Sequence, residues 1–237
     1  MSSIIAIDGA SGSGKSSTAK LLAKKYHLAY LDTGSMYRAI TYIVKSEKHN
    51  LENNKNTANF CHLLDKLISQ RKLTINLNPE NFKILYFNKN INNQLRNQNI
   101  TKLVSHIASI PQIRALLIAW QQSIIAKHNF TNQHSHTKGI IVEGRDIAKV
   151  VIPEADIKIL LKSNETTRAR RRAKELNIKD ITSLAKSIDK RDKADLQINN
   201  FANPSADTVV VDNTDMSLNQ TVDFIAKIIN SKLNNLK

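Results

Sequence analysis

The fold of this chain starts from one segment, GASGSGKS, at residues Gly9–Ser16. It fits the pattern G-x-x-x-x-G-K-[ST], the P-loop, whose glycines let the backbone turn tightly around an anion. The apolar residues 3–7 before it predict a buried strand, and Ala19, Leu22 and Ala23 after it share one face of a helix. A strand, a glycine-rich loop and a helix in this order predict a phosphate-binding unit.

The residue types in the loop suit phosphate chemistry. Loop N–H groups and the helix N-terminus would face the anion, with the helix dipole adding positive potential. Lys15 can reach the β- and γ-phosphates, and the Ser16 hydroxyl can ligate Mg²⁺. A Gly/Ser-rich turn with no ligand is the alternative, and the complete motif in its proper context disfavours it. The expected nucleotide contacts are Gly9, Ala10, Ser11, Gly12, Ser13, Gly14, Lys15, Ser16 and Ser17.

Length and composition narrow the class of protein. A chain of 237 residues can hold one α/β domain with an inserted lobe. The single cysteine, Cys61, excludes an internal disulfide and fits a reducing cytosol. The N-terminus does not have the pattern of a signal peptide, and no apolar run approaches the ~18 residues of a membrane-spanning helix. We therefore expect a cytoplasmic protein with no membrane partner.

The net charge of +15 is compatible with nucleic acid, anionic membranes or phosphorylated small molecules as partners. The chain is also rich in Asn and Lys, which indicates compositional drift for most lysines. The arginines carry more information, because four of the ten lie within five residues of a predicted helix. A lid over nucleotide phosphates, a nucleic-acid-binding face and a solvated helix face all remain open for this cluster, Arg168, Arg170, Arg171 and Arg172.

A second polar cluster follows the next predicted strand, residues 28–31. Asp32 or Thr33 can cap the helix that continues from there, and Arg38 lies one turn inside it. Such a helix start could receive a second phosphate-bearing ligand, or it could be an ordinary cap with a surface arginine. Farther on, the alternating segments 72–77 and 82–87 predict a β-hairpin that interrupts the βαβ order and belongs to a separate lobe.

The second half of the chain returns to the α/β pattern. Two apolar helical stripes are followed by a core strand at 139–142. Ser105 and Arg114 lie in the two predicted helices, away from the most buried positions of the stripes. The core strand ends in Glu143-Gly144-Arg145-Asp146. The acidic residue at the strand end can act on Mg²⁺ through water, and the Arg–Asp pair after it can face a ligand or be purely structural. Residues 156–161 and 208–211 predict two more strands. Between them, the buried face of a helix near 181–188 continues into Arg191 and Asp195, which can pair with each other or reach a ligand.

Several of these segments together resemble the bacterial cytidylate kinase (CMP kinase) family. The likeness covers residues 3 to about 230, and the Leu-Asp-Thr-Gly and Glu-Gly-Arg-Asp-Ile segments are its most specific parts. It rests on Ile7-Asp8-Gly9 with the P-loop, Leu31–Arg38, Glu143–Ile147, Val150–Asp156, Arg168–Arg172 and Lys190-Arg191-Asp192 with Asp195. The hairpin near 73–87 also looks like the insert that marks the bacterial CMP kinases.

The resemblance implies an α/β fold of the P-loop NTPase type. Its five-stranded parallel sheet has helices on both faces, and it carries an inserted NMP-binding lobe with a β-hairpin and a short lid. The implied single domain has its core at 1–32, 139–163 and 205–237, the NMP-binding lobe at about 33–130 and the lid at about 164–200. The implied reaction is ATP + CMP (or dCMP) → ADP + CDP (or dCDP), with Mg²⁺, by a cytoplasmic monomer without a stable nucleic-acid partner.

The resemblance also implies roles for individual residues. Arg38 and Arg145 would hold the acceptor phosphate, and Thr33 and Tyr37 would line the acceptor site. Ser105, Arg114 and Asp146 would recognise the cytosine edge, where a carboxylate accepts a hydrogen bond from N4 and disfavours uracil. Arg191 and Asp195 would meet the ribose and nearby phosphate. Arg168 would lie along the adenine, Lys15, Arg145 and Arg172 would act on the transferring phosphoryl group, and Ser16 and Glu143 would serve Mg²⁺, the latter through water.

Some positions depart from the family pattern. Ile198 stands where the family usually has an arginine, three residues beyond Asp195. Ala194 replaces another common basic residue, Ala148-Lys149 replaces a usual Gly-Thr, and Ala10 replaces a usual proline. The change at Ile198 removes one positive charge from the expected acceptor site. It predicts weaker CMP binding or an altered ribose preference, unless Lys190 or Lys193 substitutes.

Two other functions compete with this interpretation. A P-loop protein that docks RNA through the Arg168–Arg172 helix would bind polynucleotide in a salt-dependent way without CMP turnover. The chain lacks aromatic stacking platforms near that cluster, which argues against it. A kinase for another small acceptor, such as AMP, UMP or shikimate, would not need the combination of Ser105, Arg114 and Asp146.

Overall fold

The computed structural model describes residues 3–129, 139–176, 180, 185, 188–189, 192–193 and 203–235. Contacts divide the chain into two units. Unit 1 comprises Met1–Leu31 and Ile125–Lys237, and unit 2 comprises Asp32–Ile124. Each unit has its own buried apolar centre, exemplified by Ile5 and Leu22 in unit 1 and by Ile40 and Leu64 in unit 2.

Unit 1 is built on a five-stranded sheet with the order β2-β6-β1-β7-β8. Its strand β1 pairs in parallel with both β6 and β7, and β7 pairs in parallel with β8. β1 is a central strand of a parallel sheet, in which helices cover both faces, and its seven residues are all buried, as the apolar run in the sequence predicted. The strands are β1 Ser3–Gly9, β2 Ala29–Asp32, β6 Gly139–Gly144, β7 Ile157–Lys162 and β8 Val209–Asp212.

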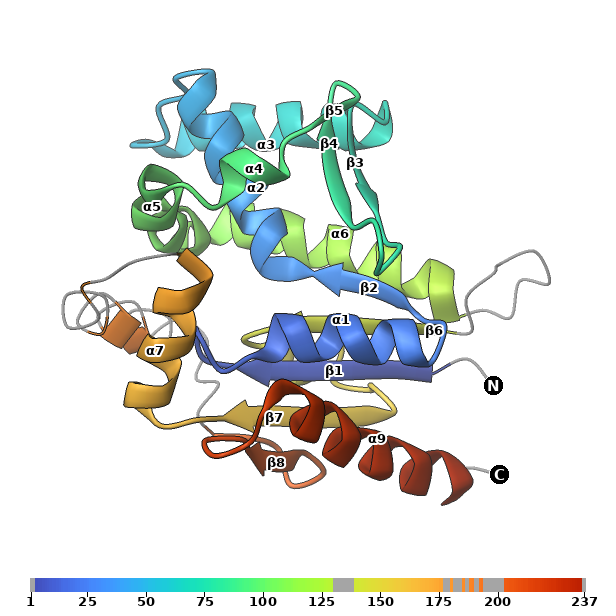
Figure 1. The fold of residues 1–237 in the computed structure, drawn as a ribbon. Helices are drawn as coiled ribbons and strands as arrows, with labels where there is room; N and C mark the ends of the chain where they lie inside the picture. Colours follow the sequence, from blue (N-terminus) through green and yellow to red (C-terminus); the bar gives the residue numbers. More distant parts are fainter. Residues whose placement is uncertain are drawn as a thin grey trace. The chain divides into compact units, whose positions relative to one another are not determined.

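Helices flank this sheet. α1 (Lys15–Lys25) and α9 (Leu218–Asn235) contact each other and lie side by side in Figure 1. The arrowheads of β1 and β7 point toward the side on which α7 (Glu165–Leu176) lies, so the P-loop after β1 lies at the carboxyl edge of the sheet (Figure 1). The predicted fold class, a P-loop α/β fold with a five-stranded parallel sheet flanked by helices, is confirmed.

The connection from β6 to β7 contains an element that the sequence did not predict. The apolar residues there form a π-helix, η1 (Ile147–Val151), before β7 begins at Ile157. The Ile152 N–H donates to the Ile147 carbonyl at 2.8 Å, the wider i→i+5 bond of this helix type. Such turns occur frequently at functional sites.

Unit 2 joins five helices and a small antiparallel sheet. The predicted hairpin is confirmed, with Leu73 opposite Tyr86 and Asn76 opposite Lys83, and a third strand that the sequence did not indicate extends it. The elements are α2 Thr33–Ser46, α3 Asn54–Ser69, β3 Leu73–Asn76, β4 Lys83–Tyr86, β5 Lys89–Asn90, α4 Asn92–Leu95, α5 Gln98–Ser109 and α6 Pro111–Asn129, whose last residues belong to unit 1. The connection between α2 and α3 is short, because Asn53 already caps α3.

In the part of the chain that the structure describes, no single helix has the length and hydropathy of a membrane span. Helices α5 and α6 meet that test only when they are taken together across a bend of 94°.

Candidate nucleotide-binding site

The P-loop has the backbone geometry that an anion site needs. Gly14 has φ +88° and caps the N-terminus of α1, and Gly12 has φ +78°. A Cβ on Gly12 would lie 2.6 Å from the Arg168 carbonyl oxygen of α7, so a side chain is excluded there on two grounds. The Lys15 ammonium donates to the Ala10 carbonyl at 3.3 Å, across the loop. The loop is therefore shaped by its own glycines and packed closely against α7.

A polar cluster that the sequence did not reveal holds the P-loop by a hydrogen bond to its backbone. Asn213, which follows β8 and is buried, donates from Nδ2 to the Ser13 carbonyl at 3.0 Å. Arg171 of α7 donates from Nη2 to the Asn213 and Met216 carbonyls at 2.8 and 2.9 Å, and from Nη1 to Asn213 Oδ1 at 3.1 Å and to Ser163 Oγ at 3.0 Å. This cluster ties the P-loop, α7 and the β8–α9 connection together.

Two of the expected ligand-binding arginines meet at one carboxylate. Arg145 Nη1 lies 2.9 Å from Asp192 Oδ1, and Arg168 Nη1 forms an ion pair with Asp192 Oδ2. Arg168 Nη1 also donates to the Ser11 carbonyl at 3.1 Å, while the Ser11 N–H donates to Asp192 Oδ1 at 3.4 Å. The structure thus brings together the P-loop, Arg145 and Arg168. Asp192 joins them, a residue that the sequence showed only as part of the Lys190-Arg191-Asp192 segment and without a role of its own.

The remaining arginines of α7 point to different partners. Arg172 pairs with Glu175 of its own helix at 2.6 Å, and Arg170 is exposed. Protein groups already bind most of these charges, because Arg168, Arg171 and Arg172 all bond to side chains or carbonyls of unit 1. Three of the four arginines that would form a basic face for RNA are therefore already bonded to protein groups.

Candidate metal ligands lie on β6 and at the start of α1. Glu143 is 1% exposed and accepts a hydrogen bond from the Tyr30 hydroxyl of β2 at 3.1 Å. Ser16 is half-buried in the first turn of α1. The described residues hold no group of three or more His, Cys, Asp or Glu that could bind a metal. Mg²⁺ usually takes one or two carboxylates, phosphate oxygens and water, so a hydroxyl and a buried carboxylate are donors of the right kind for it.

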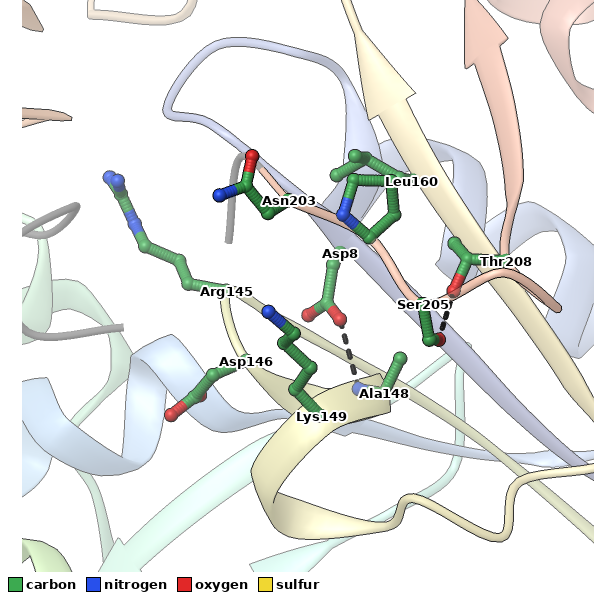
Figure 2. A pocket seen from close by; sticks show the side chains of 10 residues that line it. Asp8, Arg145, Asp146, Ala148, Lys149, Leu160, Asn203, Ser205 and Thr208 are labelled. Carbon is green, nitrogen blue, oxygen red and sulfur yellow. Dashed lines mark hydrogen bonds between the residues drawn. The ribbon is translucent and has the colours of Figure 1, made fainter. Parts of the chain in front are cut away.

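A cavity at the same edge of the sheet is lined by Asp8, which sequence reasoning treated only as part of a motif. Figure 2 shows its carboxylate directed at the Ala148 backbone nitrogen, and it accepts from the Ile147 and Ala148 N–H groups at 2.9 Å each. Burial raises the pKa of Asp8 to about 6, and these two hydrogen bonds oppose the rise. The full lining is Asp8, Arg145, Asp146, Ala148, Lys149, Leu160, Asn203, Pro204, Ser205 and Thr208.

Unit 2 contains the other acceptor-site candidates. Asp32 caps α2, with Oδ1 accepting from the Ser35 N–H at 2.8 Å, which decides between the two predicted caps. Arg38 is buried and donates from Nη1 to the Leu95 carbonyl and to Thr101 Oγ1, both at 2.9 Å. The other candidates there are Thr33, which is buried, and Tyr37, Ser105 and Arg114, which are half-buried. Arg191, Asp195 and Ile198 lie outside the described residues.

Comparison with known proteins adds the family. The family model described as cytidylate kinase matches residues 5–231. Curated proteins named cytidylate kinase include one from Streptomyces griseus (34% identical, covering 97% of this chain and 93% of its own) and one from Listeria welshimeri (36% identical, 98% and 97%). Another, from Mesomycoplasma hyopneumoniae strain 7448, is 36% identical over 97% of this chain and 94% of its own length.

Among solved structures, a gluconokinase from Sinorhizobium meliloti aligns with a TM-score of 0.51 over 99% of this chain and 95% of its own. At 13% identity this likeness concerns the fold alone. The family assignment rests on the whole-length match and on relatives that share a third of their residues with this chain. The chain therefore belongs to the cytidylate kinase family.

Proposed function

We propose that this protein transfers the γ-phosphoryl group of ATP to CMP and to dCMP, giving ADP and CDP or dCDP. The observation that carries the proposal is the P-loop of β1 and α1, with Arg145 and Arg168 gathered beside Ser11. Phosphoryl transfer asks little covalent chemistry of the protein and depends on positioning and on positive charge near the phosphates. A P-loop with two adjacent guanidinium groups, in a member of this family, supports that chemistry.

The donor side of the proposed reaction lies in unit 1. Gly9 to Ser17 hold the ATP phosphates through backbone N–H groups, Lys15 leaves the Ala10 carbonyl to meet the β- and γ-phosphates, and Arg168 lies along the adenine. Arg145 and Arg172 act on the transferring group. Ser16 and, through water, Glu143 hold Mg²⁺, which when bound neutralises developing charge on the phosphate oxygens. The hydrogen bond from the Tyr30 hydroxyl holds the buried Glu143 side chain in one orientation, which suits this role.

The acceptor side of the proposed reaction follows the roles that the family resemblance gives to individual residues. We assign the CMP phosphate to Arg38 and Arg145, the cytosine edge to Ser105, Arg114 and Asp146, and the lining to Thr33 and Tyr37. The ribose and its neighbouring phosphate would meet Arg191 and Asp195. Two acceptors hold Arg38 at Nη1, which fixes the direction of its guanidinium and suits a defined phosphate position. In this proposal unit 2 is the NMP-binding lobe, and α7 with the residues that follow it is the lid.

The proposed setting is the cytosol, which the single Cys61 supports, with CMP and dCMP as the small-molecule partners and a monomer as the working form. Coupled ADP-release assays with ATP, Mg²⁺ and each of CMP, dCMP, UMP and AMP test the reaction. Turnover with CMP and dCMP and little with AMP is the expected result. ATP binding without turnover of any cytidine acceptor would overturn the proposal.

Asp146 provides a sharper test of the acceptor. A carboxylate accepts a hydrogen bond from the cytosine N4 amine, whereas uracil presents a carbonyl there, so Asp146→Asn should lower the CMP/UMP ratio of kcat/KM by about tenfold or more. Glu154→Gln is the matched control, because it removes the same charge from an exposed position in the same β6–β7 connection. A ratio that is equal in both variants would contradict the cytosine-reading role.

A further inference from the structure

We propose that Asp192 is a positioning residue that gathers Arg145 and Arg168 against the P-loop before nucleotide binds. The inference deepens the proposed function and rests on it, because the two arginines matter for the reaction only if ATP binds at that place. It assigns to Asp192 no contact with the substrates. Its action passes through the two guanidinium groups.

The contacts of Asp192 come from three separate parts of unit 1. Arg145 follows β6, Arg168 belongs to α7, and Ser11 is part of the P-loop. Asp192 Oδ1 accepts hydrogen bonds from Arg145 Nη1 at 2.9 Å and from the Ser11 N–H at 3.4 Å. Oδ2 accepts a hydrogen bond from Arg168 Nη1. The side chains of Asp192 and Arg168 are each 9% exposed, and that of Arg145 is 12% exposed.

Charge and burial explain why a carboxylate is needed at this point. Two guanidinium groups that are close together and largely removed from water repel each other, and screening by solvent is weak there. A shared carboxylate offsets that repulsion, while its removal leaves buried charges without compensation, which is costly. An asparagine has one oxygen in place of two and turns an N–H group toward one guanidinium. Without the carboxylate, at least one arginine should leave its position beside Ser11.

The consequence for the reaction is pre-organisation. An ATP molecule that reaches the P-loop finds both guanidinium groups already placed, Arg145 for the transferring phosphoryl group and Arg168 along the adenine. Its binding therefore does not need to bring the two arginines together against their repulsion. The same geometry admits an opposite idea, in which the carboxylate occupies the place of a phosphate and competes with it. The two ideas predict opposite changes in ATP affinity when the charge of Asp192 is removed.

Calorimetric titration of the full-length protein with ATP and Mg²⁺ separates these outcomes. Asp192→Asn should weaken ATP binding by about tenfold, the loss expected for one well-placed contact. Asp189→Asn is the matched control, since Asp189 lies three residues earlier, is more exposed and pairs with Lys193. Its affinity should stay within about twofold of the wild type. An unchanged or tighter affinity in Asp192→Asn would overturn the proposal.

Two further measurements separate positioning from damage to the fold. Misfolding lowers the fraction of protein that binds, whereas positioning changes the dissociation constant at full stoichiometry. Asp192→Glu keeps the charge and shifts it by one methylene, so its affinity should fall between those of the wild type and Asp192→Asn. If Asp192→Asn does not fold, the proposal depends on Asp192→Glu, and wild-type affinity in that variant would refute it.

A double-mutant cycle with Arg168→Met completes the test. If Asp192 acts through Arg168, the loss from Asp192→Asn should be several-fold smaller in the Arg168→Met background. Equal losses in both backgrounds would count against the proposal. ATP binding is measured without an acceptor, so the two tests are independent. Failure of CMP turnover would refute the proposed function alone, and the comparison of ATP affinities would still decide the role of Asp192.

Discussion

Arg171 offers the most quantitative test of how unit 1 holds its P-loop. Replacing it by methionine keeps an unbranched side chain of helix-forming type and removes all of its donors. Two of its hydrogen bonds, from Nη2 to the Asn213 and Met216 carbonyls, are as short as 2.8 and 2.9 Å. Hydrogen bonds from a charged donor contribute about 1.5–3 kcal/mol each, and the low end applies because Arg171 is only half-buried. The expected loss in the free energy of unfolding is therefore about 3 kcal/mol.

The neighbouring arginine supplies the control. Arg170 is exposed on the same helix, and Arg170→Met should change the free energy of unfolding by less than about 0.5 kcal/mol. Arg171→Lys should lie between the two, because a single ammonium cannot span the positions that the planar guanidinium reaches. Urea unfolding followed by far-UV circular dichroism gives the three values.

Arg171→Met should also affect nucleotide binding by the P-loop. Asn213 donates to the Ser13 carbonyl, and Arg171 holds Asn213 by its Oδ1 and its carbonyl. Arg171→Met should therefore raise the KM for ATP, while Arg170→Met should leave it unchanged. Equal unfolding free energies for Arg171→Met and Arg170→Met would refute the reasoning, since the two changes differ only in the contacts seen in the structure.

Three further predictions concern single side chains. Since burial raises the pKa of Asp8 to about 6, above its unfolded value, its contribution to stability is present at low pH and is lost as pH rises through 6. The free energy of unfolding of the wild type minus that of Asp8→Asn should thus fall by about 2 kcal/mol between about pH 4.5 and about pH 7; parallel curves would contradict the raised pKa. Tyr30→Phe removes a hydrogen-bond donor from the buried Glu143, so it should lower the free energy of unfolding by about 1–2 kcal/mol and raise the Mg²⁺ concentration for half-maximal activity. Tyr26→Phe is the control, because the Tyr26 hydroxyl bonds Ala226 and Asn230 near the surface. It should leave the Mg²⁺ dependence unchanged. Ile198→Arg should lower the KM for CMP by adding a positive charge to the acceptor site, and an unchanged KM would remove that explanation of the departure from the family pattern.

The elements themselves were largely predictable. The strands of unit 1 are short apolar runs between turn residues, and those runs predict buried parallel strands because both faces must be covered. The hairpin followed from alternation and from the turn residues 78–81. The π-helix η1 had no such signal, because its apolar residues fit an extended segment equally well. Asp32 and Thr33 could both cap α2, and only the backbone at Asp32 decided between them.

The candidate site was predictable in part. Lys15, Arg145 and Arg168 were named from motifs, and the structure places them in unit 1 with the P-loop at the carboxyl edge of the sheet. The same motifs gave no reason to single out Asp192, Asn213 or the carboxylate of Asp8. Arg168 and Arg172 belong to one arginine cluster in the sequence, but only the structure shows that the first bonds Asp192 and the second Glu175.

The sequence by itself determined the local phosphate-binding unit. Positive φ at Gly12 and Gly14 and the order strand, loop, helix are properties of adjacent residues, so they can be recognised without the rest of the chain. Tertiary structure alone decided which charges meet. Asp192 lies 47 residues from Arg145 and 24 from Arg168, and Asn213 lies 200 residues from Ser13. Such pairs form because parallel strands from distant parts of the chain end at one edge of a sheet, and no local pattern specifies which side chains arrive there together.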